Sequence, residues 1–205
     1  MIGRISAALL LASAGAVVAQ PALAHTGLHV GGFAAGLAHP FLGVDHLLAM
    51  LSVGGLAAIA AARGQRQALW ALPLSFMALM ALGGGLAIGG LAIGGASLPA
   101  VELGIGVSLV VFGIMLATRF GLPVVAATAL VGGFALFHGH AHGAELPASA
   151  SALAYGLGFV LASGLLHGAG VFLARGLQRL PTWSGLSIRI AGSAVAATGV
   201  ILLIG

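Results

Sequence analysis

Cysteine and lysine are both missing from this chain of 205 residues, and charge of either sign is scarce. Without cysteine there is no disulfide, no thiolate metal site and no thiol nucleophile, so any bound metal must be held by nitrogen, oxygen or thioether sulfur. Charged residues make up 5% of the chain, whereas an ordinary soluble domain has about a quarter. These shortages exclude a soluble globular domain and a disulfide-rich secreted one.

A basic patch is missing as well, although the sequence pI is about 11.6. That value comes from seven arginines and three acids spread along the chain, with no cluster that could hold phosphates. We therefore expect no nucleic-acid partner. A Walker-type phosphate loop is also lacking, so nothing in this chain indicates an ATP-binding subunit.

Long apolar stretches are what the sequence has instead: 60% of its residues are hydrophobic and the mean hydropathy is +1.20. Stretches of roughly 20 apolar residues are typical of transmembrane helices, and the alternating pattern of a membrane barrel is lacking. The sequence therefore predicts an all-α, polytopic helix bundle in the lipid bilayer. Its six transmembrane helices are expected at residues 35–61, 68–93, 101–118, 122–144, 150–174 and 186–205.

The first residues have the pattern of a cleavable signal peptide. Arg4 precedes an apolar run over residues 5–19, and Ala22-Leu23-Ala24 offers a cleavage site between small residues. We expect a signal peptide at 1–24 and a transmembrane domain at 25–205; the alternative is an uncleaved additional helix. Cleavage would leave His25 at the new amino terminus, outside the cytoplasm, with His29 close behind.

The arginines predict how the helices are oriented. If the mature amino terminus is periplasmic, every arginine after Arg4 falls at a cytoplasmic turn or helix end, as the positive-inside rule requires. The opposite turns, near residues 97–102 and 145–149, contain no arginine. The sequence thus predicts a multi-pass protein of the bacterial inner (cell) membrane. The arginines concerned are Arg63, Arg66, Arg119, Arg175, Arg179 and Arg189.

Two clusters of histidine and carboxylate interrupt this apolar background, one over residues 39–46 and one over residues 137–145. Ionisable groups inside a membrane are costly and mark functional sites. In the predicted topology both clusters lie in the outer half of the bilayer, so they could form one site. His138, His142 and Glu145 share one helical face, while His140 points nearly the opposite way.

In the first cluster, Pro40 disfavours helical geometry at His39, which is expected at a helix start or in a bent segment. On a continuous helix His46 returns to nearly the same face as His39. Asp45 beside it could act as a ligand, as a proton acceptor, or as a hydrogen-bond partner that orients a ligand without binding the metal itself. Met50, one turn further, is interpreted as packing.

Imidazole suits nickel, zinc, copper and iron, and carboxylates can complete the set of ligands. The sequence therefore predicts a transition-metal site without sulfur. His167 lies deeper, toward the cytoplasm, and with His25 and His29 at the outer mouth it is a candidate for an accessory metal path. The predicted metal ligands are His39, Asp45, His46, His138, His142 and Glu145.

The glycine-rich repeat at residues 86–95 is interpreted as a close contact between helices.

The motifs His39-x5-Asp45-His46 and Phe137-His138-Gly139-x-Ala141-His142-Gly143-x-Glu145 resemble those of the HupE/UreJ family of nickel permeases. The resemblance implies that residues 25–205 form a permease domain and that the six predicted ligands matter for transport. It also implies that the protein is no enzyme and has no resident cofactor. Ni²⁺ or Co²⁺ would be taken up into the cytoplasm to supply hydrogenase or urease. Facilitated diffusion and proton exchange both stay open.

Other classes compete with this interpretation. A haem-binding membrane cytochrome would also use histidines from two helices, but one haem would not explain the adjacent acids. A structural membrane accessory protein is a further alternative. An intramembrane hydrolase is disfavoured, because there is no His-Glu-x-x-His motif and the serine nearest a candidate histidine, Ser163 by His167, lies in a glycine-rich packing segment.

Overall fold

The computed structural model describes residues 32–92, 98–146, 151–179 and 184–205, all within one compact unit. These residues form seven α-helices, one short 3₁₀ helix and no strand, which confirms the predicted all-α fold. The predicted signal peptide, His25 and His29 lie outside the described residues. The elements are α2 (Gly32–Ala38), η1 (His39–Phe41), α3 (Val44–Ala62), α4 (Ala68–Ala92), α5 (Val101–Thr118), α6 (Val124–Ala144), α7 (Ala152–Gln178) and α8 (Ser184–Ile204).

Six of these helices, α3 to α8, are long and apolar enough to cross a membrane. They expose large apolar side chains over much of their length, such as Leu165, Phe172 and Ile190. Exposed apolar surface of this extent is a liability in water but is suited to lipid tails. The chain is therefore a multi-pass membrane protein.

The single helix predicted for residues 35–61 is wrong at its beginning, whereas the helix start or bent segment predicted at His39 is confirmed. We expected one helix over 35–61, whereas the structure has α2, then η1, then α3 starting at Val44. Pro40 lacks the N–H that a continuous helix would use, and Gly43 adopts an extended conformation that separates η1 from α3. The other five spans agree with the prediction to within four residues at each end.

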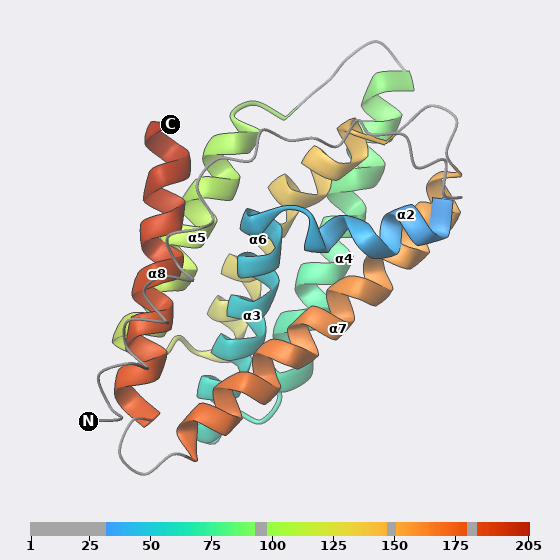
Figure 1. The fold of residues 1–205 in the computed structure, drawn as a ribbon. Helices are drawn as coiled ribbons and strands as arrows, with labels where there is room; N and C mark the ends of the chain where they lie inside the picture. Colours follow the sequence, from blue (N-terminus) through green and yellow to red (C-terminus); the bar gives the residue numbers. More distant parts are fainter. Residues whose placement is uncertain (1–31, 93–97, 147–150, 180–183) are drawn as a thin grey trace, which may run out of the picture. The chain divides into compact units, whose positions relative to one another are not determined.

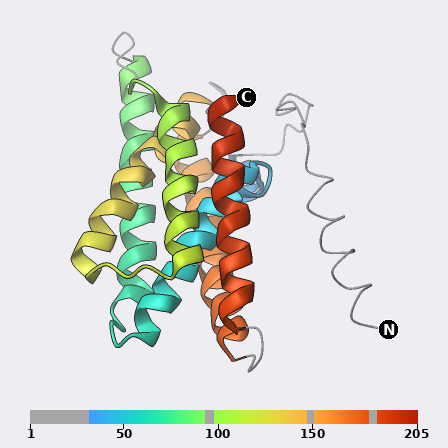
Figure 2. The same ribbon diagram turned by 90° about the vertical axis from the view of Figure 1, so that its left-hand side faces the viewer.

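The long helices pack in pairs: α4 with α6, α5 with α8, and α3 with α7. The first two pairs can be followed in both views, and the short α2 lies against α7 (Figure 1, Figure 2). Glycines allow this close approach. A Cβ atom on Gly54 of α3 would overlap the carbonyl of His167, and one on Gly170 of α7 would overlap that of Leu51.

The glycine-rich repeat of residues 86–95 contacts α6 at its beginning, as predicted: Ala87 is buried, and a Cβ atom on Gly143 would lie 2.9 Å from the Ala87 side chain. A Cβ atom on Gly89, within the repeat, would meet no atom within 4 Å. A closer contact is made just before the repeat, where a Cβ atom on Gly83 would overlap the carbonyl oxygen of Leu136 in α6. Part of the repeat, residues 93–97, lies outside the described segments.

The arginines at the helix ends lie at one end of the bundle. The Arg63 guanidinium donates a hydrogen bond to the carbonyl of Arg119, which joins the α3–α4 and α5–α6 turns. Arg66 and Arg175 line one shallow hollow, and Arg119 and Arg189 line another. This grouping is the one that the positive-inside rule requires.

Candidate metal centre

The two histidine motifs meet at the end of the bundle opposite to the arginines. His46 lies in the first turn of α3, and His138 and His142 lie in the last two turns of α6. The ring centre of His142 is 4.6 Å from that of His39 and 4.0 Å from that of His46. The ring centres of His46 and His138 are 4.9 Å apart. The four predicted histidines therefore form a continuous row, in the order His39, His142, His46, His138.

Separations of this size suit neighbouring imidazoles that bind an ion in pairs, whereas among the described residues three ligand atoms come within 4.8 Å of one another only at His39, His142 and Glu145. With metal–nitrogen bonds of about 2.0–2.1 Å, two imidazoles on adjacent coordination positions have ring centres about 4.4–5 Å apart, and two on opposite positions about 6 Å apart. The observed 4.0, 4.6 and 4.9 Å fall near the first range. Neighbouring rings of the row are too close to each other to lie on opposite sides of one haem iron.

His142 is the centre of the row. It is 5% exposed, and neither of its ring nitrogens has a hydrogen-bond partner within the described part of the chain. Buried polar atoms nearly always have a partner, so an unpaired imidazole at this position is unusual. Its lone pair is free for a ligand.

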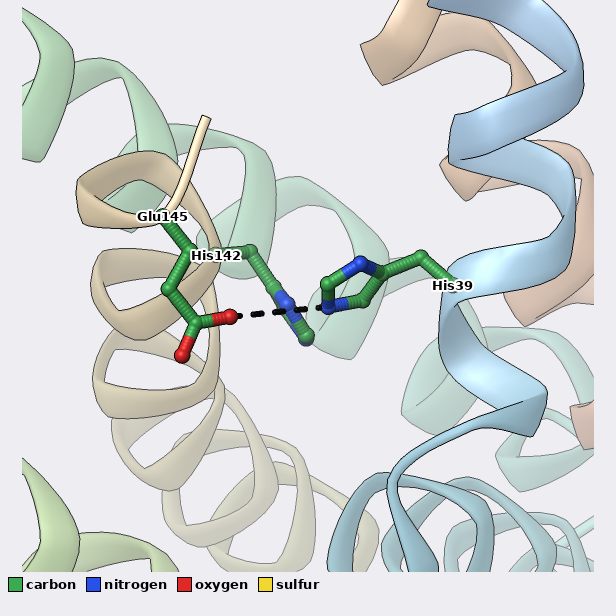
Figure 3. A group of neighbouring side chains, drawn as sticks. All are labelled: His39, His142 and Glu145. Atoms are coloured by element: carbon green, nitrogen blue, oxygen red, sulfur yellow. Dashed lines mark ion pairs between the residues drawn. The ribbon is translucent and has the colours of Figure 1, made fainter. Parts of the chain in front are cut away.

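The outer part of the row combines His39, His142 and Glu145, which can each offer one ligand atom within 4.8 Å of the others. Their side chains point toward one another from η1 and from the end of α6 (Figure 3). His39 Nε2 lies 3.7 Å from Glu145 Oε2, a spacing that suits two atoms on one ion, since such ligand atoms are about 3–4 Å apart. Glu145 is exposed, so this part is accessible from outside the bundle.

The charge state of His39 fits this arrangement. Burial, aided by the nearby His46, lowers the pKa of His39 from 6.5 to about 4. The imidazole is therefore neutral at neutral pH, which is the form that binds metal ions.

Asp45 lies behind His46. Its Oδ1 atom is 2.8 Å from His46 Nδ1 and also accepts a hydrogen bond of 2.8 Å from the backbone N–H of His46. A carboxylate can only accept, so His46 carries its proton on Nδ1 and keeps the lone pair on Nε2. That Nε2 atom is buried and has no partner among the described residues. Of the three roles that the sequence allowed for Asp45, the geometry favours an orienting partner.

The inner end of the row contains a residue that sequence analysis missed. The Ser108 hydroxyl of α5 lies 2.9 Å from His138 Nε2, and both residues are fully buried. A single serine in an apolar span carries no sequence signal for such a contact, because most such hydroxyls bond only to their own helix backbone.

Phe76 of α4 lies beyond His138 and was also missed. Its ring centre is 5.6 Å from that of His138 and 5.2 Å from that of His167. His167 Nδ1 is 2.5 Å from the carbonyl oxygen of Ser163, so its lone pair is on Nε2, which has no partner among the described residues. His167 thus lies outside the row of four, and the Phe76 ring contacts both His138 and His167.

The remaining candidates have structural roles. His140 points away from the row, as predicted, and its Nε2 accepts a hydrogen bond of 3.0 Å from the backbone N–H of Leu98. Met50 is fully buried in the apolar core, in agreement with its interpretation as packing.

The glycines of the second motif explain its spacing. Gly139 and Gly143 each follow a histidine and face α4, where a Cβ atom would overlap the carbonyl oxygens of Met80 and Gly84 respectively. The histidines one residue earlier are thereby held at a fixed position relative to α4. The motif thus alternates ring-bearing positions with helix-contact positions.

These features define a multi-pass helical membrane protein with a row of four closely spaced imidazoles at one end, three of them buried. The sequence matches the family model described as "HupE / UreJ protein" over residues 11–202. It is also 41% identical over 192 residues to "Protein HupE" of Rhizobium leguminosarum bv. viciae, covering 93% of this chain and 95% of that protein. The chain belongs to the HupE/UreJ family, as its motifs predicted. No solved structure matches it.

Proposed function

We propose that this protein is a permease, and not an enzyme, that carries Ni²⁺ or Co²⁺ across the inner membrane into the cytoplasm to supply hydrogenase or urease. The observation that supports this most directly is the row of four imidazoles from η1, α3 and α6. Nitrogen ligands with a carboxylate nearby suit both ions. Membership of the HupE/UreJ family agrees with this role.

The proposed ligands act in two groups along the row. His39, His142 and Glu145 receive the ion from outside, and His142 passes it to His46 and His138. Asp45 orients His46 in this scheme. Because His142 is close to the rings on both sides, an ion can exchange one ligand at a time without leaving the row.

A driving force for uptake is available without ATP. With a periplasmic amino terminus, the row faces the periplasm and the arginine end faces the cytoplasm. A divalent cation moving inward then gains roughly 4.6 kcal/mol per 100 mV of membrane potential, twice the value for one charge. His25 and His29 would capture ions at the outer mouth, and His167 would be the next station inward.

Metal binding is the first expected result. The purified protein in detergent should bind Ni²⁺ in a calorimetric titration, and EDTA should remove the ion, since neutral imidazoles and a carboxylate form the site. The protein should show no Soret band in its visible spectrum. Absence of measurable Ni²⁺ and Co²⁺ binding would favour a structural accessory role, and a Soret band would favour a cytochrome.

The orientation can be tested because the natural chain contains no cysteine. Gln67 at the arginine end and Pro99 at the histidine end are both exposed, so each can be replaced by cysteine in turn. A membrane-impermeant thiol reagent added to intact spheroplasts should label Pro99→Cys and leave Gln67→Cys unlabelled until the membrane is opened. The reverse pattern would show that the protein is inserted the other way, contrary to inward transport from the histidine end.

A further inference from the structure

We propose that Ser108 is a positioning residue that makes His138 bind the transported ion through Nδ1 and not through Nε2. This inference rests on the proposed function and names a contributor from α5, a helix that neither histidine motif includes. It follows from the hydrogen bonds of one hydroxyl group.

The Ser108 hydroxyl has a single proton, and the backbone of α5 takes it. Ser108 Oγ lies 2.6 Å from the carbonyl oxygen of Ile105 and donates to it. The same oxygen is 2.9 Å from His138 Nε2. Two oxygens 2.6 Å apart repel unless a proton lies between them, so the hydroxyl proton points to Ile105 and the serine oxygen acts as the acceptor toward the imidazole. His138 therefore carries its proton on Nε2.

The tautomer decides which atom is free to bind a metal. A neutral imidazole that is protonated on Nε2 has its only ring lone pair on Nδ1. His138 Nδ1 is buried and has no hydrogen-bond partner among the described residues. His138 is fully buried, so water does not compensate for this. Its ring lies next to that of His46, whose free lone pair is on Nε2 because Asp45 holds the other nitrogen.

The inner histidines are therefore fixed by two different partners. Asp45 leaves His46 with a free Nε2, and Ser108 leaves His138 with a free Nδ1, so the two rings present opposite nitrogens. Hydrogen bonds from partners behind the ligands orient the rings and raise their basicity. His142 has no such partner in the described part of the chain, which suits a ligand that exchanges between the two sides.

The first test reads the tautomer directly in the full-length protein. In detergent micelles with ¹⁵N-labelled histidine, the two nitrogens of a neutral imidazole have separate chemical shifts, and His138→Gln identifies the His138 signals. We expect the proton on Nε2 in the unmutated protein and a loss of this preference in Ser108→Ala. A proton on Nδ1 in the unmutated protein would overturn the inference, whether or not any variant transports metal.

The second test measures transport. Ser108→Ala should raise the half-saturating Ni²⁺ concentration for uptake by about tenfold to a hundredfold, as removal of a partner behind a metal ligand does. Ser75→Ala is the matched control, because Ser75 also donates to the carbonyl three residues earlier, that of Leu72, at 2.9 Å, while its second contact, at 3.5 Å, is with the backbone carbonyl of Thr128 and not with an imidazole. Ser108→Thr retains the acceptor oxygen, so its half-saturating Ni²⁺ concentration should stay close to that of the unmutated protein.

The outcomes separate this inference from the proposed function. If His142→Ala loses uptake while Ser108→Ala behaves like Ser75→Ala, Ser108 has no positioning role and the permease assignment stands. If every one of these variants takes up Ni²⁺ like the unmutated protein, the proposed site itself is wrong.

Discussion

Replacing His142 with alanine is expected to reduce Ni²⁺ uptake by about a hundredfold or more. This exceeds the usual effect of removing a residue that only hydrogen-bonds to a metal ligand. Among the described residues, His142 is the one ring in contact with both His39 and His46, so its loss should divide the row into two parts that cannot exchange an ion. Uptake of labelled Ni²⁺ in cells without other nickel importers measures this. His46→Ala should have a similar effect, because it separates His142 from His138.

The matched control for this prediction is His140→Gln. His140 is a buried histidine in the same helical turn, but it faces Leu98 and not the row. Glutamine keeps an acceptor near the position of Nε2, so uptake should stay close to that of the unmutated protein. If His142→Ala accumulated as much metal as His140→Gln, the central position assigned to His142 would be wrong.

Gly139→Ala is expected to destabilise the protein by about 3 kcal/mol, the upper part of the range for overpacking. The new methyl group would overlap the carbonyl oxygen of Met80, and because this oxygen belongs to the backbone of α4, it cannot move aside as a flexible side chain would. The helices α4 and α6 would have to separate. Circular dichroism during heating in detergent should show a lower melting temperature, together with weaker Ni²⁺ uptake.

Gly133→Ala is the control for this effect. Gly133 lies in the same helix, but a Cβ atom there would meet no atom within 4 Å. Alanine is also the better helix former by roughly 1 kcal/mol, so this variant should be as stable as the natural protein or slightly more so. Equal melting temperatures for the two variants would contradict the role assigned to Gly139.

The helices and the meeting of the two motifs were predictable from sequence. The lengths of the apolar stretches predicted five of the six spans closely. The positions of the arginines predicted that they lie at one end of the bundle, where Arg63 contacts Arg119. The spacing of His138 and His142 on one helical face, at the same depth as His46, correctly predicted that these residues lie close together. Both predictions depend on periodicity along single helices and on membrane depth.

The features that the sequence did not predict depend on how helices face one another. The role of Ser108 depends on α5 lying beside α6. The position of Phe76 depends on which face of α4 is turned toward His138. Pro40 predicted a helix start or a bend at His39, but the second break, at the extended residue Gly43, was not predicted. A helix contact at the glycine-rich segment was expected, but composition alone does not tell which of its glycines face a neighbour.

The glycine contacts also limit how the molecule can move. Gly139 and Gly143 hold α6 to α4, whereas Gly54 and Gly170 hold α3 to α7. His142 and His138 therefore belong to one helix pair, and His46 and His167 belong to the other. A backbone motion that keeps both contacts and separates His142 from His46 would therefore move one helix pair against the other as a rigid body.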